Sequence, residues 1–247
     1  MILRQFLDTY PVVAASYLVG CGGRGVAAVI DPLEGIERYL EAADSLGMRI
    51  RYVIDTHVHA DHLSSGRALA EAAAADYVLW AGVASAPGTR GVDDGESLEI
   101  GNVRLAIWHT PGHTPEHLSL LVTDGKRGPE PWSVFTGHTL MVGDMGRTEL
   151  AGSGEEGARQ LYRSARRLAQ LPDHVEVLPG AFSGSVCGRG LSGKPWSTIG
   201  FERRFNRAFR LTEEAEFVSY MLRDTPPPPA GAAETRARNL GATLQEA

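Results

Sequence analysis

The sequence contains only two cysteines, Cys21 and Cys187, among 247 residues. Two cysteines do not make a disulfide framework, so we expect reduced thiols and a cytoplasmic protein. No apolar run approaches the roughly 18 residues that a membrane-spanning helix requires, and residues 1–5 lack a signal-peptide pattern. These features predict a soluble protein that does not enter a membrane.

An excess of positive charge is also missing, because 24 lysines and arginines stand against 30 acidic residues, which gives a formal net charge of −6. Nucleic acids and anionic membranes are usually bound by basic surfaces, so neither partner is expected. The hydrophobic content of 43% is sufficient for a sizeable core. At this length, one domain with a long extension and two small domains are both compatible with the chain.

Short apolar segments alternate with helical segments along the chain. Strands are predicted at residues 2–7, 12–19, 26–30, 50–55, 77–80, 98–100, 103–108, 118–122, 132–135 and 175–178. Helices are predicted at residues 36–46, 63–76, 155–171, 199–207, 212–222 and 236–240. This alternation occurs twice and predicts an α/β fold built as a four-layer αββα sandwich. We expect one such domain over residues 1–195 and a helical C-terminal extension, residues 196–247, packed on the same domain.

The greatest concentration of reactive side chains is the motif H-V-H-A-D-H at residues 57–62, which follows a predicted strand and precedes a predicted helix. His57 and His59 point the same way, and can share a metal ion, if the backbone keeps the period of two of a strand. Seven of the eight histidines lie between His57 and His138. Imidazole is the commonest metal ligand, so the clustering predicts a metal site rather than ordinary surface histidines.

Two later histidines also occupy loops next to predicted strands. His113 lies at the apex of a segment whose two prolines and glycine exclude a helix. His138 follows the strand at residues 132–135, so it is a further strand-end histidine. For His109 and His117, a structural role explains the sequence at least as well as metal binding does.

Five motifs occur in a characteristic order: H-V-H-A-D-H at residues 57–62, P-G-H-T at 111–114, F-T-G at 135–137, G-R-T at 146–148 and L-P-G at 178–180. Together they resemble the metallo-β-lactamase-fold superfamily, whose signature is H-x-H-x-D-H. Within that superfamily, the segments at residues 135–149, 185–188 and 197–206 are most similar to the persulfide dioxygenases and their rhodanese-associated relatives. The resemblance implies the αββα sandwich with a helical C-terminal segment.

Two positions depart from the family pattern. The family has an aspartate where this chain has His138, and usually a histidine where it has Ala181. In dinuclear hydrolases that aspartate bridges two metal ions, and that histidine binds the second ion. Because this chain has neither residue, the resemblance favours a mononuclear site. It places the ligands on His57, His113 and His138, with one Fe(II) per chain as the expected ion and Zn(II) as the alternative. His59 is a ligand in the hydrolase pattern but lies just outside the metal shell in the dioxygenase pattern.

The resemblance also suggests roles for side chains around the metal. Asp61 is expected to activate water or to orient a ligand, as carboxylates beside metal-bound imidazoles often do, and His62 to form a polar wall of the pocket. Arg147 could bind a substrate carboxylate or form an ion pair with a neighbouring acid. Cys187 could help to hold the substrate thiol or could simply pack in the protein.

The function implied by the resemblance is oxidation of a low-molecular-weight persulfide, such as glutathione persulfide, to sulfite by a mononuclear non-heme iron with dioxygen. The alternatives are a zinc-dependent thioester hydrolase of the glyoxalase II type and a catalytically degenerate member that only binds a metal or ligand. The sequence leaves open a homodimer and a rhodanese-type sulfurtransferase as a partner.

Overall fold

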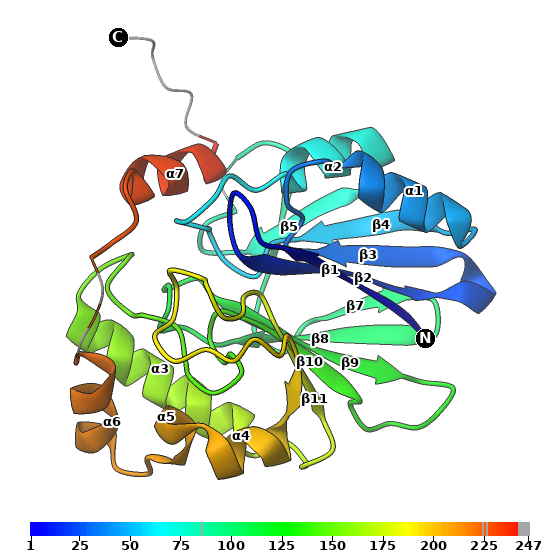
Figure 1. Ribbon diagram of the computed structural model, residues 1–247. Coiled ribbons are helices and arrows are strands. Elements are labelled where there is room, and N and C mark those ends of the chain that lie inside the picture. Colours follow the sequence, from blue (N-terminus) through cyan, green and yellow to red (C-terminus); the bar gives the residue numbers. More distant parts are fainter. Residues whose placement is uncertain (85, 224, 226, 242–247) are drawn as a thin grey trace, which may run out of the picture.

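The computed structural model describes residues 1–84, 86–223, 225 and 227–241, in which two six-stranded sheets face each other between two layers of helices (Figure 1). The first sheet has the order β1-β2-β3-β4-β5-β6 and comprises β1 (Ile2–Asp8), β2 (Ala14–Cys21), β3 (Val26–Ile30), β4 (Arg49–Ile54), β5 (Asp76–Trp80) and β6 (Thr89–Val92). The second has the order β12-β11-β10-β9-β8-β7 and comprises β7 (Ser97–Ile100), β8 (Val103–His109), β9 (Leu118–Asp124), β10 (Ser133–Gly137), β11 (Glu176–Pro179) and β12 (Ser197–Thr198). The predicted αββα sandwich is therefore confirmed.

Seven α-helices are present in the described residues: α1 (Glu37–Ser45), α2 (Gly66–Ala73), α3 (Gly154–Leu168), α4 (Ile199–Phe205), α5 (Arg207–Arg210), α6 (Glu214–Met221) and α7 (Ala232–Asn239). Helices α1 and α2 cover the outer face of the first sheet, and α3 to α6 cover the second (Figure 1). Helix α7 leaves that second layer and lies on the side of the first sheet. No described helix combines the length and the apolar character needed to cross a membrane.

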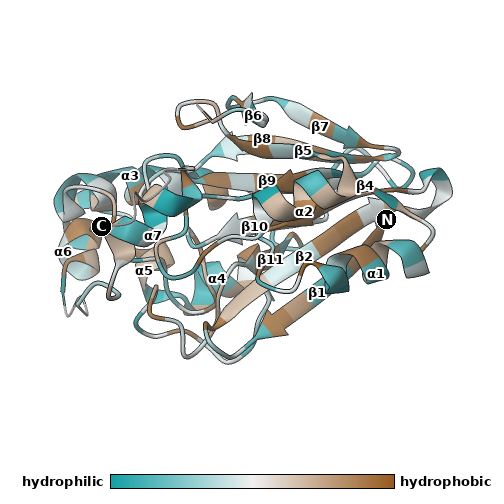
Figure 2. Cartoon of the chain, turned by 90° about the horizontal axis from the view of Figure 1, so that it is seen from above, coloured by the Kyte–Doolittle hydropathy of each residue, from teal (hydrophilic) through white to brown (hydrophobic). Residues whose placement is uncertain are grey.

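Alternation of side chains along the strands explains why two cores form. On β2, Tyr17 and Val19 face the second sheet, whereas Leu18 between them packs in the cluster under α1 and α2. Because both faces are covered, such strands are hydrophobic throughout their length rather than at every second residue. Figure 2 shows this as brown colour along much of the strands. The edges of the sandwich are left for loops, where polar side chains collect.

Several predicted boundaries were wrong. The helix expected at residues 63–76 is limited to Gly66–Ala73, because Ser64 Oγ accepts a hydrogen bond from the Gly66 amide and the chain already enters β5 at Asp76. The helix expected at residues 199–207 ends at Phe205, because the Asn206 side chain caps a new short helix by accepting from the Phe209 amide. Strands β6 and β12 were not predicted at all.

Candidate metal centre

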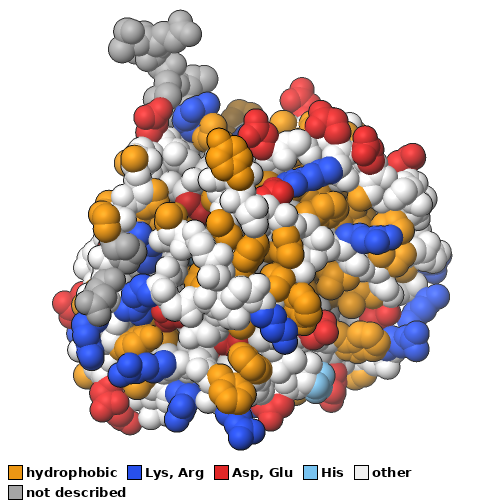
Figure 3. All heavy atoms as spheres, in the orientation of Figure 1, with side chains coloured by type: hydrophobic (Ala, Val, Ile, Leu, Met, Phe, Trp, Pro, Cys, Tyr) orange, Lys and Arg blue, Asp and Glu red, His pale blue; other side chains and the backbone are white. Residues whose placement is uncertain are grey.

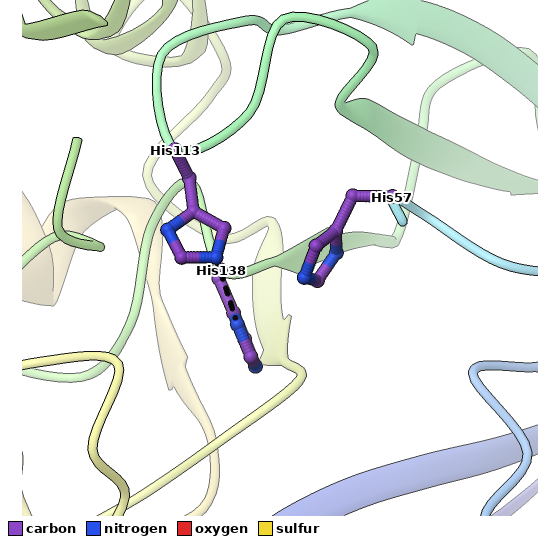
Figure 4. A group of neighbouring side chains, drawn as sticks. All are labelled: His57, His113 and His138. Carbon is purple, nitrogen blue, oxygen red and sulfur yellow. Dashed lines mark hydrogen bonds between the residues drawn. The ribbon is translucent and has the colours of Figure 1, made fainter. Parts of the chain in front are cut away.

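Three loops at one edge of the sandwich bring His57, His113 and His138 together (Figure 4). One loop follows β4, one connects β8 and β9, and one follows β10. The potential ligand nitrogens of the three side chains all lie within 4.8 Å of one another, and none of the three residues is more than 1% exposed. The face of the molecule shown in Figure 3 has very little histidine at its surface.

Two of these rings, those of His57 and His113, are oriented by neighbours outside the group. His57 Nδ1 lies 2.9 Å from Thr56 Oγ1, and the Thr56 amide and hydroxyl both donate to the carboxylate of Asp31, at 2.6 and 2.9 Å. His113 Nδ1 donates to the carbonyl oxygen of Arg147 over 2.7 Å, and its Nε2 faces the other rings, 3.2 Å from Nδ1 of His138 (Figure 4). Hydrogen bonding of the second imidazole nitrogen is the usual way in which a protein fixes a ligating histidine.

Glycines of the F-T-G and G-R-T motifs allow this close approach. A Cβ atom on Gly146 would lie 2.2 Å from the carbonyl oxygen of His138 and 3.0 Å from Nδ1 of His113. A Cβ atom on Gly137, where φ is +46°, would lie 2.5 Å from both Thr56 Oγ1 and Nε2 of His117. The F-T-G and G-R-T motifs thus supply the space in which the histidines meet.

Burial makes the three imidazoles neutral. It lowers the pKa of His57 well below its usual value, the pKa of His113 to about 3 and that of His138 to about 4, with neighbouring histidines adding to the effect. His57 Nε2 and His138 Nε2 have no hydrogen-bond partner within the part of the chain that the structure describes. Buried nitrogens without partners require an explanation, and neutral imidazole lone pairs are what a dipositive metal ion binds. The donor set therefore fits a metal.

His117 has a structural role. Its Nδ1 lies 3.2 Å from Thr110 Oγ1 and 3.0 Å from Thr139 Oγ1, and its Nε2 accepts a hydrogen bond from the amide of His138 at 3.0 Å. Burial lowers the pKa of His117 well below its usual value, so the ring is neutral and can accept that bond. His117 thus fixes the backbone of the loop that carries His138.

His59, Asp61 and His62 form a second group beside the first. The ring centroids of His57 and His59 are 4.2 Å apart, but His59 Nε2 lies 3.3 Å from Asp31 Oδ1. Although burial alone would lower the pKa of His59, the hydrogen bond to Asp31 and three surrounding carboxylates raise it to about 9. The structure therefore places His59 among acids rather than in the three-histidine group, and its assignment as a metal ligand stays a prediction.

Asp61 and His62 are paired with each other. Asp61 Oδ1 lies 2.9 Å from His62 Nδ1, and despite burial, the charge and the hydrogen bond of His62 hold the pKa of Asp61 well below its usual value. Both residues line one end of a cavity of about 680 Å³, whose other walls include Tyr10, Leu33 and Arg38. Of the histidine groups, this cavity therefore touches the one formed by His59, Asp61 and His62.

Arg147 and Cys187 lie closer to the site than their sequence positions suggested. Arg147 is 4% exposed and forms an ion pair with Glu149, and it also donates to the carbonyl oxygen of Val186 at 3.1 Å. Cys187 is 1% exposed, and its Sγ lies 3.5 Å from Asp61 Oδ2. Ala181, at the position where the resemblance expects a histidine, is fully buried.

Sequence reasoning missed the residues that hold the histidine loop from both sides. The Val58 amide donates to Glu116 Oε1 at 3.0 Å, and Arg236 on α7 donates to the Val58 carbonyl oxygen at 2.6 Å. Arg236 and Glu116 themselves form an ion pair at 3.2 Å, and Asn239 donates to the carbonyl oxygens of His59 and His62, at 2.9 Å each. Their sequence signal is weak, because the contact of Glu116 with Val58 spans 58 residues and those of α7 with the histidine loop span 177 to 180.

Comparison with known proteins agrees with this geometry. Residues 9–180 match the model of the metallo-beta-lactamase superfamily. The chain is 29% identical over 225 residues to the mitochondrial persulfide dioxygenase ETHE1 of Homo sapiens, covering 90% of this chain and 80% of the relative. It is 33% identical over 180 residues to the hydroxyacylglutathione hydrolase of Rhodospirillum rubrum, covering 70% of this chain and 66% of the relative.

Among solved structures, ETHE1 from Myxococcus xanthus superimposes with a TM-score of 0.81 at 32% identity, covering 97% of this chain and 100% of that chain. The chain therefore shares its fold with a group of proteins that contains both dioxygenases and hydrolases. From the family match, the αββα sandwich and the buried histidine centre together, this chain is a member of the metallo-beta-lactamase superfamily.

Proposed function

We propose that this protein is a persulfide dioxygenase-like enzyme that oxidises a small thiol persulfide to sulfite, using one Fe(II) held by His57, His113 and His138. In such a reaction, each turnover consumes one dioxygen and one water and releases the thiol and sulfite. The bound iron would supply the redox chemistry that activation of dioxygen requires. The observation that carries the proposal is a buried set of only three neutral imidazoles, on a chain that aligns over its length with ETHE1.

The three-histidine set suits this substrate class. Three neutral imidazoles leave the charge of a dipositive ion uncompensated, whereas a carboxylate would cancel one unit of it. A more positive centre favours an anionic ligand such as a persulfide. Asp61, which is ionised, lines the cavity and has a carboxylate oxygen within 4.8 Å of a nitrogen of His138, so it can orient the substrate or accept its proton.

The rest of the site excludes water and fixes the ligands. Arg147 holds His113 through its carbonyl oxygen, and its side chain ties the loop that carries Cys187 to the G-R-T motif. This arrangement uses the guanidinium group for internal contacts, including the ion pair with Glu149. We therefore assign Arg147 to positioning the site, and leave substrate binding to groups around the cavity.

A second candidate function is hydrolysis of a thioester with zinc, as in hydroxyacylglutathione hydrolases. The observation in its favour is the group of His59, Asp61 and His62, whose potential ligand atoms also lie within 4.8 Å of one another. Against it stands Ala181, which offers no ligand to a second ion at the position where the family has one. The ion pairs of His59 with acids further reduce its availability.

The test is to purify the protein without oxygen, measure its metal content, and follow oxygen uptake after adding glutathione persulfide. Bound iron with rapid oxygen uptake and formation of sulfite would support the dioxygenase. Zinc with no uptake, together with hydrolysis of S-lactoylglutathione, would contradict it and favour the hydrolase. A His113→Ala variant serves as the control, because any uptake that persists in it does not come from this centre.

A further inference from the structure

Helix α7 is attached to the rest of the protein without an apolar face. None of its eight residues, A-A-E-T-R-A-R-N, is buried, and alanine supplies its only apolar side chains. In Figure 1, α7 lies away from helices α3 to α6, which cover the second sheet. A helix of this length is marginal on its own in water, and most helices in proteins are stabilised by packing of an apolar face. Polar contacts must therefore hold α7 in place.

Two side chains of α7 make these polar contacts. Within the described part of the chain, the hydrogen bonds and ion pairs from α7 side chains to other segments come from Arg236 and Asn239. Arg236 donates to the Val58 carbonyl oxygen at 2.6 Å and forms an ion pair with Glu116 at 3.2 Å. Because Glu116 also accepts from the Val58 amide at 3.0 Å, the guanidinium and the carboxylate together hold one peptide unit on each side of Val58.

Asn239 makes three further contacts with a single side chain. Its Nδ2 donates to the carbonyl oxygens of His59 and His62, at 2.9 Å each. Its Oδ1 accepts a hydrogen bond from the Ser64 amide at 3.0 Å. The carboxamide therefore uses both its donors and its acceptor on one loop, whereas an ionised aspartate, which has the same shape, would offer acceptors alone.

These contacts fall on the loop that carries His57. Residues 55–65 contain no helix or strand, so no regular ladder supplies partners for their backbone groups. Helix α7 provides partners for four of these groups, the carbonyl oxygens of residues 58, 59 and 62 and the amide of residue 64. The direction of the His57 imidazole depends on the course of this backbone, and hence on α7.

We propose that Arg236 and Asn239 are positioning residues of the metal centre, and that attachment of α7 and binding of a divalent cation at the three-histidine group stabilise each other. The cation would order the loop through His57, and α7 orders the same loop through its backbone. Coupling of this kind is reciprocal, so a helix that raises the affinity for the cation is itself held more tightly, by the same factor, once the cation is bound. The inference does not depend on whether the centre oxidises or hydrolyses its substrate.

The first test uses the unmodified, full-length protein, and compares hydrogen–deuterium exchange of the α7 amides in the metal-depleted form and in the form loaded with zinc(II). Exchange reports attachment, because so short a helix loses its hydrogen bonds when it separates from the loop. We expect zinc to slow the exchange by about 10- to 100-fold, the range by which residues that support a metal ligand change metal affinity. Exchange that zinc leaves unchanged would overturn the proposal.

Variants then show which groups carry the coupling. Asn239→Ala and Arg236→Ala should each weaken zinc binding by about 10- to 100-fold, measured by competition with a chelator of known affinity. The matched control is Arg238→Ala, on an exposed position of the same helix with no side-chain contact to the loop among the described residues, which should bind zinc as the unmodified protein does. Equal losses in Asn239→Ala and Arg238→Ala would contradict a role for these particular contacts.

Asn239→Asp separates positioning by hydrogen bonds from the mere presence of a side chain. The variant retains an acceptor for the Ser64 amide but places an oxygen against the carbonyl oxygens of His59 and His62. It should therefore lose at least as much zinc affinity as Asn239→Ala. If Asn239→Asp binds zinc as tightly as the unmodified protein, the donors of Asn239 do not position the loop, and the proposal is wrong.

Discussion

Two histidine groups lie side by side in this protein and differ in their electrostatics. His57 and His59 are two residues apart, and their ring centroids are separated by 4.2 Å. Burial among other histidines lowers the pKa of His57 well below its usual value, whereas three carboxylates raise the pKa of His59 to about 9. One short motif therefore supplies a neutral nitrogen to a metal centre and a cation to an ion-pair network. The environment, rather than the residue type, decides which histidine can bind a metal.

The largest effect should come from removing a member of the neutral group. His113→Ala deletes one of three nitrogens that converge within 4.8 Å, so we expect loss of the bound metal and a fall in activity of at least about 100-fold, the upper end of the range for residues that merely support a ligand. Metal analysis and a steady-state assay would measure this. His174→Ala is the matched control, because His174 is exposed and lies outside the histidine groups.

A metal content equal to that of the unmodified protein in His113→Ala would show that the three-histidine group is not the metal site. The comparison between the two groups would then reverse, and His59, Asp61 and His62 would become the candidate centre.

The second largest effect should come from the contact that holds both groups in place. Arg236, which is partly exposed, forms an ion pair with the buried Glu116 at 3.2 Å, and each also binds the backbone of Val58, between His57 and His59. Arg236→Ala leaves the Glu116 carboxylate buried without its partner, which should cost about 3 kcal/mol in the free energy of unfolding. Denaturant unfolding would measure this loss. Arg238→Ala, on an exposed position of the same helix, should change the free energy by less than about 0.5 kcal/mol.

If Arg236→Ala and Arg238→Ala destabilise the protein equally, helix α7 is not attached to the histidine loop in the way that these contacts require.

Much of this architecture could be predicted from the sequence. Local spacing predicted that His57 and His138 stand at the ends of strands, whereas their assignment as ligands together with His113 came from the resemblance to the metallo-β-lactamase-fold superfamily. The layered fold was predictable because apolar strands and amphipathic helices alternate. Strands β6 and β12 were missed because they contain only four and two residues, too few to show a pattern.

The position of Cys187 could not be predicted for a different reason. Its loop has no helix or strand, so no periodicity indicates where the thiol points, and the contact with Asp61 spans 126 positions in the sequence. The environment of His59 was equally hidden, because Asp31 reaches it from the end of β3. A period of two predicts that His57 and His59 share a side, but it does not show which of them a neighbouring acid will bind.

A smaller effect is expected from His59→Gln, which removes the imidazole that contacts Asp31 and leaves the three-histidine group unchanged. If His59 supports the site through Asp31 rather than by binding the metal, the variant should retain the metal and lose about tenfold in metal affinity, the lower end of the range for supporting residues. Competition with a chelator of known affinity would measure it. Complete loss of metal, as in His113→Ala, would instead make His59 a ligand. Asp31→Asn is the matching variant, since it removes the other half of the same contact.

The smallest effects per variant should appear as opposite pH dependences in the metal-depleted protein. The pKa values of about 3 for His113 and about 4 for His138 are below the value of about 6.5 in an unfolded chain. The folded protein therefore binds fewer protons than the unfolded one in acid, and the free energy of unfolding should fall as the pH decreases from about 6.5 towards 4. For His59, with a pKa of about 9, the stabilisation is complete below about pH 6.5 and is lost as the pH rises through 9.

Each of these histidines changes the free energy of unfolding by up to about 1.4 kcal/mol per pH unit between its pKa in the unfolded chain and its pKa in the folded protein. Denaturant unfolding at a series of pH values should therefore show greatest stability, as far as these histidines are concerned, close to pH 6.5. His113→Ala should reduce the slope of only the acid side of the profile, since His57, His117 and His138 still contribute there. His59→Gln should flatten only the alkaline side. If both variants changed the same side, His113 and His59 would not occupy the electrostatically opposite environments that distinguish the metal centre from its supporting ion pairs.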